Sequence, residues 1–360
     1  MSNGFDDFYA IIPAGGTGTR LWPLSREAKP KFLFDLLGSG RTLIQSTFDR
    51  LAAIAGMDHV CISTGERHVD AVEEQMPEVA PEHIFAEPAP RDSTAAIALA
   101  TAVLARRHGN DIVVGSFAAD HVIRGKVAFV DAVRQAVATA RAGYVTTIGI
   151  AASRPSTAFG YIHEGESLAA RVPDAPDAVL VERFVEKPNA ATAQAYLNTG
   201  EYRWNAGMFV WSIPTVCEQL DKHCPELASF VEHIAESPDP QETIREEFPA
   251  LTPISIDFAL MENADRVLNI EATFDWDDVG SWISVANYLE THNKNTTNTD
   301  ITVQDASGNI VFSQRGDKHV ALLGVENLIV VETADAILIA DKNKADEIKK
   351  IVNQLPDELR

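Results

Sequence analysis

The sequence predicts an α/β protein with a doubly wound, mainly parallel β-sheet, followed by a smaller all-β unit. Apolar runs of strand length alternate with amphipathic helical segments over the first 150 residues, which is typical of successive β-α-β units. Short strand-like runs separated by polar turns fill the region beyond residue 300. A chain of 360 residues is long enough for one main domain with a small domain appended to it.

The first strand is predicted at residues 8–12, where an apolar run ends at Pro13 and a cluster of glycines. Such a run indicates a strand buried on both faces, near the centre of the sheet. The clearest helix spans residues 93–108, because this segment is rich in alanine and is followed by Gly109. The other strands of this half are predicted at residues 59–63, 83–86, 111–117 and 145–150, and the other helices at residues 42–55, 66–75 and 127–142.

The alternation weakens after Ile150, where the predicted strands at residues 179–185 and 208–211 are separated by polar loops. The polar, turn-rich segment 291–299 is interpreted as a linker. This interpretation divides the chain into domains at residues 1–290 and 291–360. Within the second domain, strands are predicted at residues 301–303, 309–313, 320–323, 328–332 and 336–340, and a closing helix at residues 343–355.

Composition argues against several classes of partner. The 30 Lys and Arg residues against 52 Asp and Glu residues give a formal net charge of -22, which repels nucleic-acid polymers and anionic membrane surfaces. The apolar run at residues 8–14 is too short for a signal peptide or a membrane span, so we expect a cytoplasmic protein. The three cysteines, Cys61, Cys217 and Cys224, lack zinc-like spacing, and a large core needs no disulfide.

A glycine-rich loop, Ala-Gly-Gly-Thr-Gly-Thr-Arg at residues 14–20, directly follows the first strand. In this position the backbone N–H groups of the loop and the N-terminus of a following helix can converge on a phosphate. The dinucleotide fingerprint requires glycine where Leu21 stands, and the P-loop requires Gly-Lys-Ser/Thr, so neither common nucleotide pattern fits. A structural turn remains an alternative. A basic cluster downstream favours phosphate binding; its members are Arg20, Arg26, Lys29 and Lys31.

Residues 15–26, continued by residues 29–33, resemble the signature of the sugar-nucleotide pyrophosphorylases, and the stretch 22–26 resembles their mannose-1-phosphate guanylyltransferase branch. Six later segments match signatures of that family in the same order: 87–88 with Arg91, 119–121, 159–162, 185–188, 204–209 and 278–282. The resemblance covers the whole chain. It implies a Rossmann-like, doubly wound mixed sheet of the nucleotidyltransferase, GT-A-like type, with a small C-terminal β-helix domain.

The resemblance implies transfer of GMP from GTP to α-D-mannose 1-phosphate, giving GDP-mannose and pyrophosphate. The sugar phosphate attacks the α-phosphorus in line, so catalysis depends on positioning and on charge neutralisation rather than on a protein nucleophile. By family position, the catalytic residues are Arg20, over the β and γ phosphates, and Lys31, near the reacting centre.

The implied cofactor is Mg²⁺, because a hard cation that bridges phosphates takes carboxylate and water ligands. The family places its metal at Asp120 and Asp278, although Asp275 and Asp277 leave open which of three neighbouring carboxylates binds it. Imidazole is a poor magnesium ligand, so His121 is interpreted as structural.

Substrate-binding residues also follow from the resemblance. Glu186 is the expected acceptor of sugar hydroxyls and Lys187 the expected contact of the sugar phosphate, with an exposed turn and a local ion pair as the alternative. The implied sugar-phosphate residues are Gly160, Glu186, Lys187, Asn205 and Gly207. The implied nucleotide-binding residues are Ala14, Gly15, Gly16, Thr17, Gly18, Thr19, Arg20, Glu87, Arg91 and Asp92.

The chain departs from the family pattern at two places. Asp92 stands where relatives more often have asparagine, and it is interpreted either as a helix cap or as an acceptor for the guanine N1–H and 2-amino groups. The glutamine that many relatives carry between the residues equivalent to Lys31 and Phe32 is absent.

Two rival functions stay open. One is another sugar-1-phosphate nucleotidyltransferase that uses UTP or dTTP with glucose 1-phosphate. The other is a non-catalytic sugar-nucleotide sensor, which should have lost part of the catalytic set that this chain keeps. The sequence lacks the long isomerase domain of bifunctional relatives, so only transferase activity is expected. Because relatives form dimers through such a tail domain, a homodimer is expected.

Overall fold

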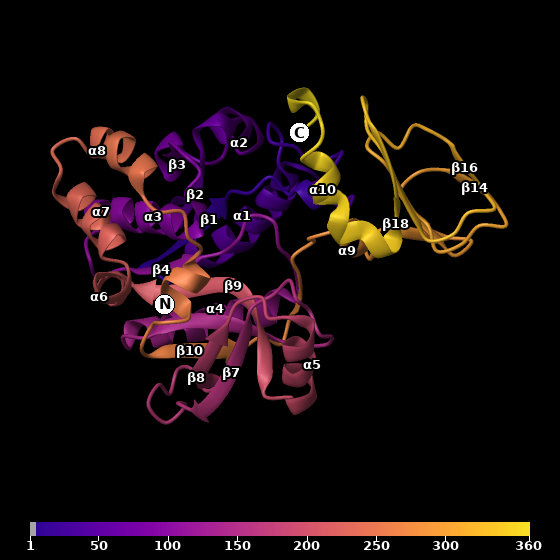
Figure 1. Ribbon diagram of the computed structural model, residues 1–360. Helices are drawn as coiled ribbons and strands as arrows, with labels where there is room; N and C mark the ends of the chain where they lie inside the picture. The colour runs from indigo at the N-terminus through magenta and orange to yellow at the C-terminus, as the bar shows by residue number, and fades with distance from the viewer. Residues whose placement is uncertain (1–4) are drawn as a thin grey trace. The chain divides into compact units, whose positions relative to one another are not determined.

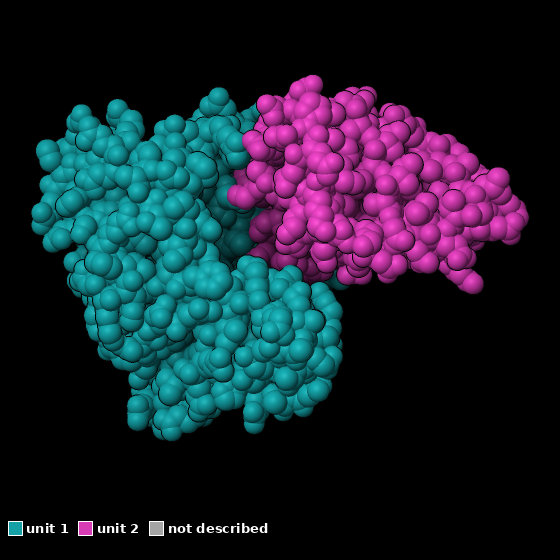
Figure 2. Space-filling model, viewed as in Figure 1, with its two compact units in different colours: residues 1–15, 47–119, 123–276 teal, residues 16–46, 120–122, 277–360 magenta. Residues whose placement is uncertain are grey.

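The computed structural model describes residues 5–360, which form two compact units (Figures 1 and 2). The described part of unit 1 comprises residues 5–15, 47–119 and 123–276, and unit 2 comprises residues 16–46, 120–122 and 277–360. Each unit therefore combines segments that are distant in the sequence. No helix of residues 5–360 is long and apolar enough to cross a membrane.

Unit 1 is built on a nine-stranded mixed sheet with the order β3-β2-β1-β4-β9-β6-β10-β8-β7. Strands β3, β2, β1 and β4 run parallel, as the β-α alternation predicts. Strand β9 lies antiparallel between β4 and β6, so the sheet is mixed, as the resemblance implies. The strands are β1 (Phe8–Ala14), β2 (Val60–Gly65), β3 (Ile84–Glu87), β4 (Val113–Ser116), β6 (Val145–Ala151), β7 (Tyr161–Ser167), β8 (Ala178–Val185), β9 (Tyr202–Ser212) and β10 (Val267–Glu271). Two short strands, β5 (Val122–Arg124) and β11 (Asp275–Asp277), lie where the chain passes between units.

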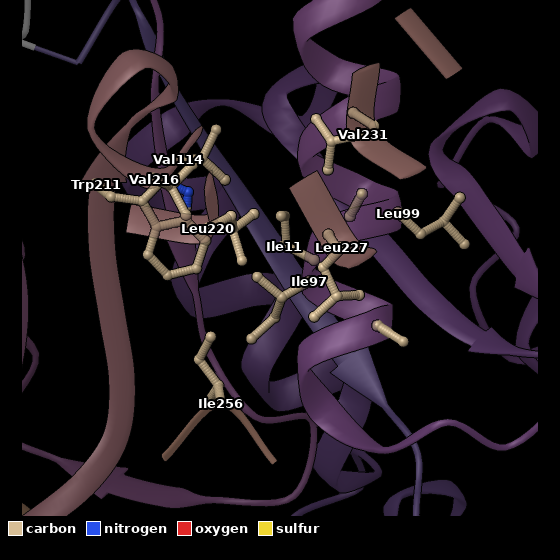
Figure 3. Packing of buried hydrophobic residues seen from close by; sticks show 14 of the residues in the cluster. Ile11, Ile97, Leu99, Val114, Trp211, Val216, Leu220, Leu227, Val231 and Ile256 are labelled. Atoms are coloured by element: carbon tan, nitrogen blue, oxygen red, sulfur yellow. The ribbon is translucent and has the colours of Figure 1, made fainter. Parts of the chain in front are cut away.

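Helices cover this sheet and share an apolar core with it. Figure 3 shows Ile11 of β1 in one cluster with Ile97 of α3 and Leu227 of α7, and each of these side chains is nearly inaccessible to solvent. Full burial of such a side chain contributes about 1.5–3 kcal/mol. The helices are α1 (Leu43–Ala55, shared by the two units), α2 (Val69–Gln75), α3 (Asp92–His108), α4 (Lys126–Arg141), α5 (Ala190–Thr199), α6 (Ile213–His223), α7 (Pro225–Glu236) and α8 (Pro240–Glu247). A π-helical turn spans Asp257–Met261.

Unit 2 holds two small sheets that stack as a β-helix. Within them β13, β15 and β17 run parallel, and β14 pairs in parallel with β16, because the chain alternates between the two sheets. The strands are β12 (Glu290–His292), β13 (Asn295–Thr297), β14 (Ile301–Gln304), β15 (Ile310–Ser313), β16 (Val320–Leu323), β17 (Leu328–Glu332) and β18 (Ile337–Asp341). Single-turn helices α9 (Trp282–Ala286) and α10 (Ile348–Val352) flank them. The predicted closing helix is therefore 3-10 helical over Lys342–Glu347 and α-helical only afterwards.

The interpretation of residues 291–299 as a linker is wrong. The segment forms β12 and β13, and Asn295 is fully buried. Its side-chain oxygen accepts from the Asn309 side-chain nitrogen (2.8 Å), and the Asn309 oxygen accepts from the Leu328 backbone nitrogen (2.8 Å). These asparagines form a ladder through successive coils, whereas composition alone reads them as solvated turn residues.

The N-terminal segment of unit 2 shares a core with its C-terminal segment. Trp22 Nε1 donates to the carbonyl oxygen of Leu359 (2.7 Å), and Trp282 Nε1 donates to the carbonyl oxygen of Trp22 (3.1 Å). The compact units thus do not follow the boundary at residues 290 and 291, since residues 16–46 pack with the β-helix. The division into domains 1–290 and 291–360 stays a prediction.

Candidate active site

The glycine-rich loop after β1 has the backbone that its composition predicts. Gly16 and Gly18 adopt positive φ angles of +82° and +61°. The turn that follows, Thr19–Leu21, is a three-residue 3-10 helix, so no α-helix begins directly after the loop. The loop therefore offers its backbone N–H groups and side chains to a phosphate, but no α-helix N-terminus.

Gly18 is the position in this loop where both the backbone conformation and the surrounding atoms disfavour a side chain. A Cβ atom there would lie 3.0 Å from Ser25 Oγ and 3.1 Å from Lys31 Cβ, in addition to the strained φ. We expect Gly18→Ala to lower the free energy of unfolding in urea by about 1–3 kcal/mol. Gly15→Ala is the matched control, because its Cβ would meet nothing within 4 Å at an ordinary φ. Equal stabilities of the two variants would contradict this account.

Lys31 lies at the centre of a polar cluster in unit 2. Its Nζ is 2.8 Å from Asp120 Oδ2 and donates to the backbone oxygen of Asp278 at 2.8 Å. Burial alone would raise the pKa of Asp120, but the Lys31 ammonium, together with His121, holds that pKa below its usual value. Asp120 is therefore an anion at neutral pH, adjacent to a fixed cation.

Arg20 reaches the same loop. Its Nη1 donates to the carbonyl oxygen of Gly280 (3.4 Å), and the side chain stays 37% exposed, with Asp346 at 4.0 Å. A Cβ atom at Gly280 would lie 2.7 Å from Asp278 Oδ2 and 3.4 Å from Arg20 Nη1, so a side chain there would displace the Asp278 carboxylate. The predicted catalytic residues and the predicted metal carboxylates thus gather in one cluster of unit 2.

Contacts separate the three neighbouring aspartates. Asp277 Oδ1 accepts from the backbone nitrogen of Val279 (2.8 Å), and Asp277 Oδ2 accepts from the Tyr288 hydroxyl (3.2 Å). Val279 is fully buried with a φ of +45°, a strained conformation for a β-branched residue. Asp277 therefore holds the backbone of this loop in place. Asp275 is exposed and belongs to unit 1.

Asp278 remains as the carboxylate available for a ligand. Its Oδ1 accepts only a long bond from the Gly280 nitrogen (3.3 Å). Residues 5–360 contain no cluster of three or more His, Cys, Asp or Glu side chains that would hold a metal on its own. Mg²⁺ usually takes one or two carboxylates together with water and substrate phosphates, so a pair such as Asp120 and Asp278 fits that cation.

The basic cluster is smaller than the sequence indicates. The Arg26 guanidinium binds the Asp335 carboxylate in a bidentate ion pair (2.6 and 2.7 Å). Lys29 Nζ lies 4.8 Å from the centre of the Phe34 ring. Both side chains thus have their contacts elsewhere in unit 2, and only Arg20 and Lys31 of the original four belong to the polar cluster.

A second polar group lies in unit 1, where β9 carries a bulge. The register between β6 and β9 shifts between Thr147 and Gly149, and Gly207 adopts a φ of +65°. As a result, Asn205 Oδ1 accepts from both the Gly207 backbone nitrogen (3.1 Å) and the Thr147 hydroxyl (3.0 Å). Bulges often redirect side chains beside active sites, and this one fixes the orientation of a buried amide.

Glu186 and Lys187 lie beside that amide. The Glu186 side chain is only 5% exposed, whereas Lys187, which pairs with it at 2.5 Å, is 57% exposed. A Cβ atom at Gly160 would lie 2.5 Å from Glu186 Oε2 and 3.4 Å from Asn205 Cβ. The structure thus brings together all five predicted sugar-phosphate residues. The local ion pair of the alternative interpretation exists too, but its carboxylate is buried rather than solvated.

Asp257 belongs to this group and was missed by sequence reasoning. Its Oδ1 accepts from Asn205 Nδ2 (2.9 Å). Burial and the neighbouring Glu186 raise the pKa of Asp257 to about 7, against the opposing effect of Lys187. Asp257 begins the π-helical turn, a feature often found at functional sites, but no spacing rule predicts such a turn.

The predicted base-binding residues lie at the ends of β2 and β3. Glu87 Oε1 accepts from Ser63 Oγ (2.9 Å), and burial raises the pKa of Glu87 to about 7. The Arg91 side chain donates to the carbonyl oxygen of Pro249, so it is tied to the backbone. Asp92 is the first residue of α3, with a φ of +64°, and its Oδ1 accepts from the adjacent Ser93 nitrogen (2.7 Å). The residue at the N-cap is Arg91, which makes no side-chain cap bond, so the structure does not support the interpretation of Asp92 as the helix cap.

Comparison with known proteins identifies the class. The family described as "Nucleotidyl transferase" matches residues 9–298, and the "MannoseP isomerase/GMP-like beta-helix domain" matches residues 300–355. The chain therefore belongs to the nucleotidyl transferase family, with a C-terminal β-helix domain. Both the predicted family and the predicted fold class are confirmed.

Individual relatives are more specific. The chain is 38% identical over 358 residues to mannose-1-phosphate guanylyltransferase of Escherichia coli K12, covering 96% of this chain and 73% of the relative. It is 36% identical over 355 residues to the xanthan biosynthesis protein XanB of Xanthomonas campestris pv. campestris B100, covering 97% of this chain and 73% of that protein. A crystal structure described as mannose-1-phosphate geranyltransferase from Thermus thermophilus matches with 31% identity and a TM-score of 0.85, covering 97% of this chain and 99% of that one.

Proposed function

We propose that the protein is an enzyme that transfers GMP from GTP to α-D-mannose 1-phosphate, releasing pyrophosphate and GDP-mannose. The observation that carries the proposal is the polar cluster of unit 2, where Lys31 contacts Asp120 and the Asp278 backbone and Arg20 reaches Gly280. The relatives named mannose-1-phosphate guanylyltransferase, at up to 38% identity, support the choice of GTP and mannose. A sensor has no need of this full set of charged residues.

The proposed reaction forms one bond and breaks one. A phosphate oxygen of mannose 1-phosphate attacks the α-phosphorus of GTP, the bond from that phosphorus to the bridging oxygen of the β-phosphate breaks, and its electron pair leaves with pyrophosphate. Lys31 neutralises charge near the reacting phosphorus, and Arg20 neutralises charge on the leaving group. The loop at residues 14–19 supplies backbone donors to the triphosphate.

Magnesium is the proposed cofactor. Asp120 and Asp278 would hold it, and a bound divalent cation supplies further neutralisation of the phosphate charge. Asp277 keeps the Asp278 loop in shape through Val279 and Tyr288, so its role is to position the ligand rather than to bind the cation.

The remaining site residues divide between sugar and base. In unit 1, Glu186 accepts hydrogen bonds from sugar hydroxyls and Asn205 donates to them through its amide nitrogen. Lys187 contacts the sugar phosphate, and Gly160 and Gly207 allow close backbone approach. Glu87, Arg91 and Asp92 form the proposed base site. A guanine ring offers N1–H and 2-amino donors, which suit carboxylate acceptors such as Glu87 or Asp92.

Pyrophosphate release tests the proposal. The purified chain is incubated with Mg²⁺, each of GTP, UTP, dTTP and ATP, and either mannose 1-phosphate or glucose 1-phosphate. We expect GTP with mannose 1-phosphate to have the highest kcat/KM by at least about tenfold, a difference of about 1.4 kcal/mol. Faster turnover of UTP or dTTP with glucose 1-phosphate would overturn the specificity. Binding of GDP-mannose without pyrophosphate release from any pair would instead identify a sensor.

A homodimer in the cytoplasm completes the proposal. Ile337 and Ile339 of β18 are 62% and 67% exposed, and Leu323 of β16 is 72% exposed, so the β-helix carries apolar side chains suited to a subunit contact. Light scattering of the purified chain should give twice the mass of 39.2 kDa. A monomer at micromolar concentration would contradict this part of the proposal alone.

A further inference from the structure

We propose that Asp257 binds a sugar hydroxyl and, together with Glu186, determines which hexose 1-phosphate the pocket of unit 1 accepts. This inference rests on the proposed function and deepens it. It assigns to the carboxylate at the start of the π-helical turn a specificity role that the motifs do not indicate.

The Asn205 amide has one fixed orientation. Its Oδ1 accepts from the Gly207 backbone nitrogen (3.1 Å), a donor that cannot be reversed. The Nδ2 atom must therefore be the one that faces Asp257, and it donates to Asp257 Oδ1 at 2.9 Å. Because the bulge at Gly207 fixes Asn205, Asn205 in turn fixes the position of the Asp257 carboxylate.

The carboxyl groups of Glu186 and Asp257 crowd around this one amide. Glu186 Oε2 and Asn205 Cβ both lie close to Gly160, and Asp257 accepts a hydrogen bond from the amide nitrogen of the same Asn205 side chain. The Glu186 backbone nitrogen donates to Glu262 Oε1 (2.9 Å). The group therefore holds three carboxylates, with Lys187 as the cation that contacts Glu186.

These carboxylates have more acceptor positions than the protein has hydrogen-bond donors to fill them. Each ionised carboxylate offers about four acceptor positions. Asp257 accepts from the Asn205 amide, and a backbone N–H and Ser255 also favour its ionised form, yet burial and Glu186 raise its pKa to about 7. A carboxylate held only as a structural anchor is normally stabilised in its charged form, which lowers the pKa. Two neighbouring hydroxyl groups of a hexose would supply the missing donors and favour the ionised state.

Steady-state kinetics of Asp257→Asn test the assignment, because the substitution keeps shape while removing acceptor capacity. We expect the KM for mannose 1-phosphate to rise at least about tenfold, with the KM for GTP within about twofold of wild type. The preference for mannose 1-phosphate over glucose 1-phosphate should fall as well. Asp265→Asn is the matched control, since this exposed aspartate on the same segment pairs with Lys222. A KM for mannose 1-phosphate that stays unchanged, or a KM for GTP that rises equally, would overturn the inference.

The pH dependence gives a readout that a merely structural role would not affect. Asp257 is ionised above its pKa of about 7, so the wild-type advantage is present at high pH and is lost as the pH falls. The groups facing Asp257 are Glu186, Lys187 and Ser255, with Glu262 behind Glu186. We expect the ratio of the variant KM to the wild-type KM to be several-fold larger at about pH 8 than at about pH 6. Titration of the substrate phosphate cancels in this ratio, and a ratio independent of pH would contradict the inference.

Failure of the inference is distinguishable from failure of the proposed function. An active wild type with an unchanged Asp257→Asn variant overturns the inference alone. A wild type without transferase activity overturns the function, and calorimetric titration of both proteins with mannose 1-phosphate and with glucose 1-phosphate then decides the inference. Equal affinities of wild type and variant for both sugars would refute it.

Discussion

Lys31→Met is expected to lower kcat for GTP and mannose 1-phosphate by about 10²–10³-fold. This is the usual effect of removing a preorganised group that stabilises the charge of a transition state. Lys31 Nζ lies 2.8 Å from both Asp120 Oδ2 and the Asp278 backbone oxygen, so the substitution removes the cation that contacts one proposed metal carboxylate and the backbone of the other. Methionine keeps the length and apolar stem of lysine. The measurement is the initial rate of pyrophosphate release at saturating substrates.

Lys29→Met is the control for that experiment. Lys29 comes from the same basic segment, but its ammonium lies over the Phe34 ring and outside the polar cluster. We expect its kcat to stay within about threefold of wild type, since an exposed cation-π contact is worth only about 0.5–1 kcal/mol. Equal losses in the two variants would mean that the general basicity of the segment, rather than the position of Lys31, supports turnover.

The part of the fold that depends on local pattern is predictable from sequence. Every β-strand expected in the first 150 residues is present within a few residues of its predicted bounds, because buried apolar runs and glycine-marked helix ends are local signals. The insertion of β9 between β4 and β6 is not local. It depends on pairing between segments about a hundred residues apart, for which hydrophobic periodicity carries no information.

The candidate site shows the same division between motif and geometry. Motifs identify Arg20, Lys31 and Asp278. By sequence, Arg26 is an equally good candidate for phosphate binding, and its ion pair with Asp335 in the structure excludes it from the cluster. Asp257 lacks any flanking glycine or basic residue that would attract notice. Its role comes from the Asn205 amide, which a bulge in another strand orients.

Asp278→Asn should raise the Mg²⁺ concentration required for half-maximal activity at least about tenfold, because loss of one carboxylate removes a charged ligand from a site that holds only one or two. Asp278 is the member of its aspartate group whose side chain makes only one long hydrogen bond, to the Gly280 nitrogen at 3.3 Å. Initial rates over a titration of Mg²⁺ at saturating GTP and mannose 1-phosphate measure the effect.

Asp277→Asn separates ligand from scaffold in the same experiment. An asparagine oxygen still accepts from the Val279 nitrogen, and its amide still reaches the Tyr288 hydroxyl, so the strained loop is retained with weaker bonds. The expected result is a lower melting temperature with an unchanged Mg²⁺ requirement, the reverse of Asp278→Asn. If Asp277→Asn shifted the Mg²⁺ requirement while Asp278→Asn did not, the metal would bind the other carboxylate.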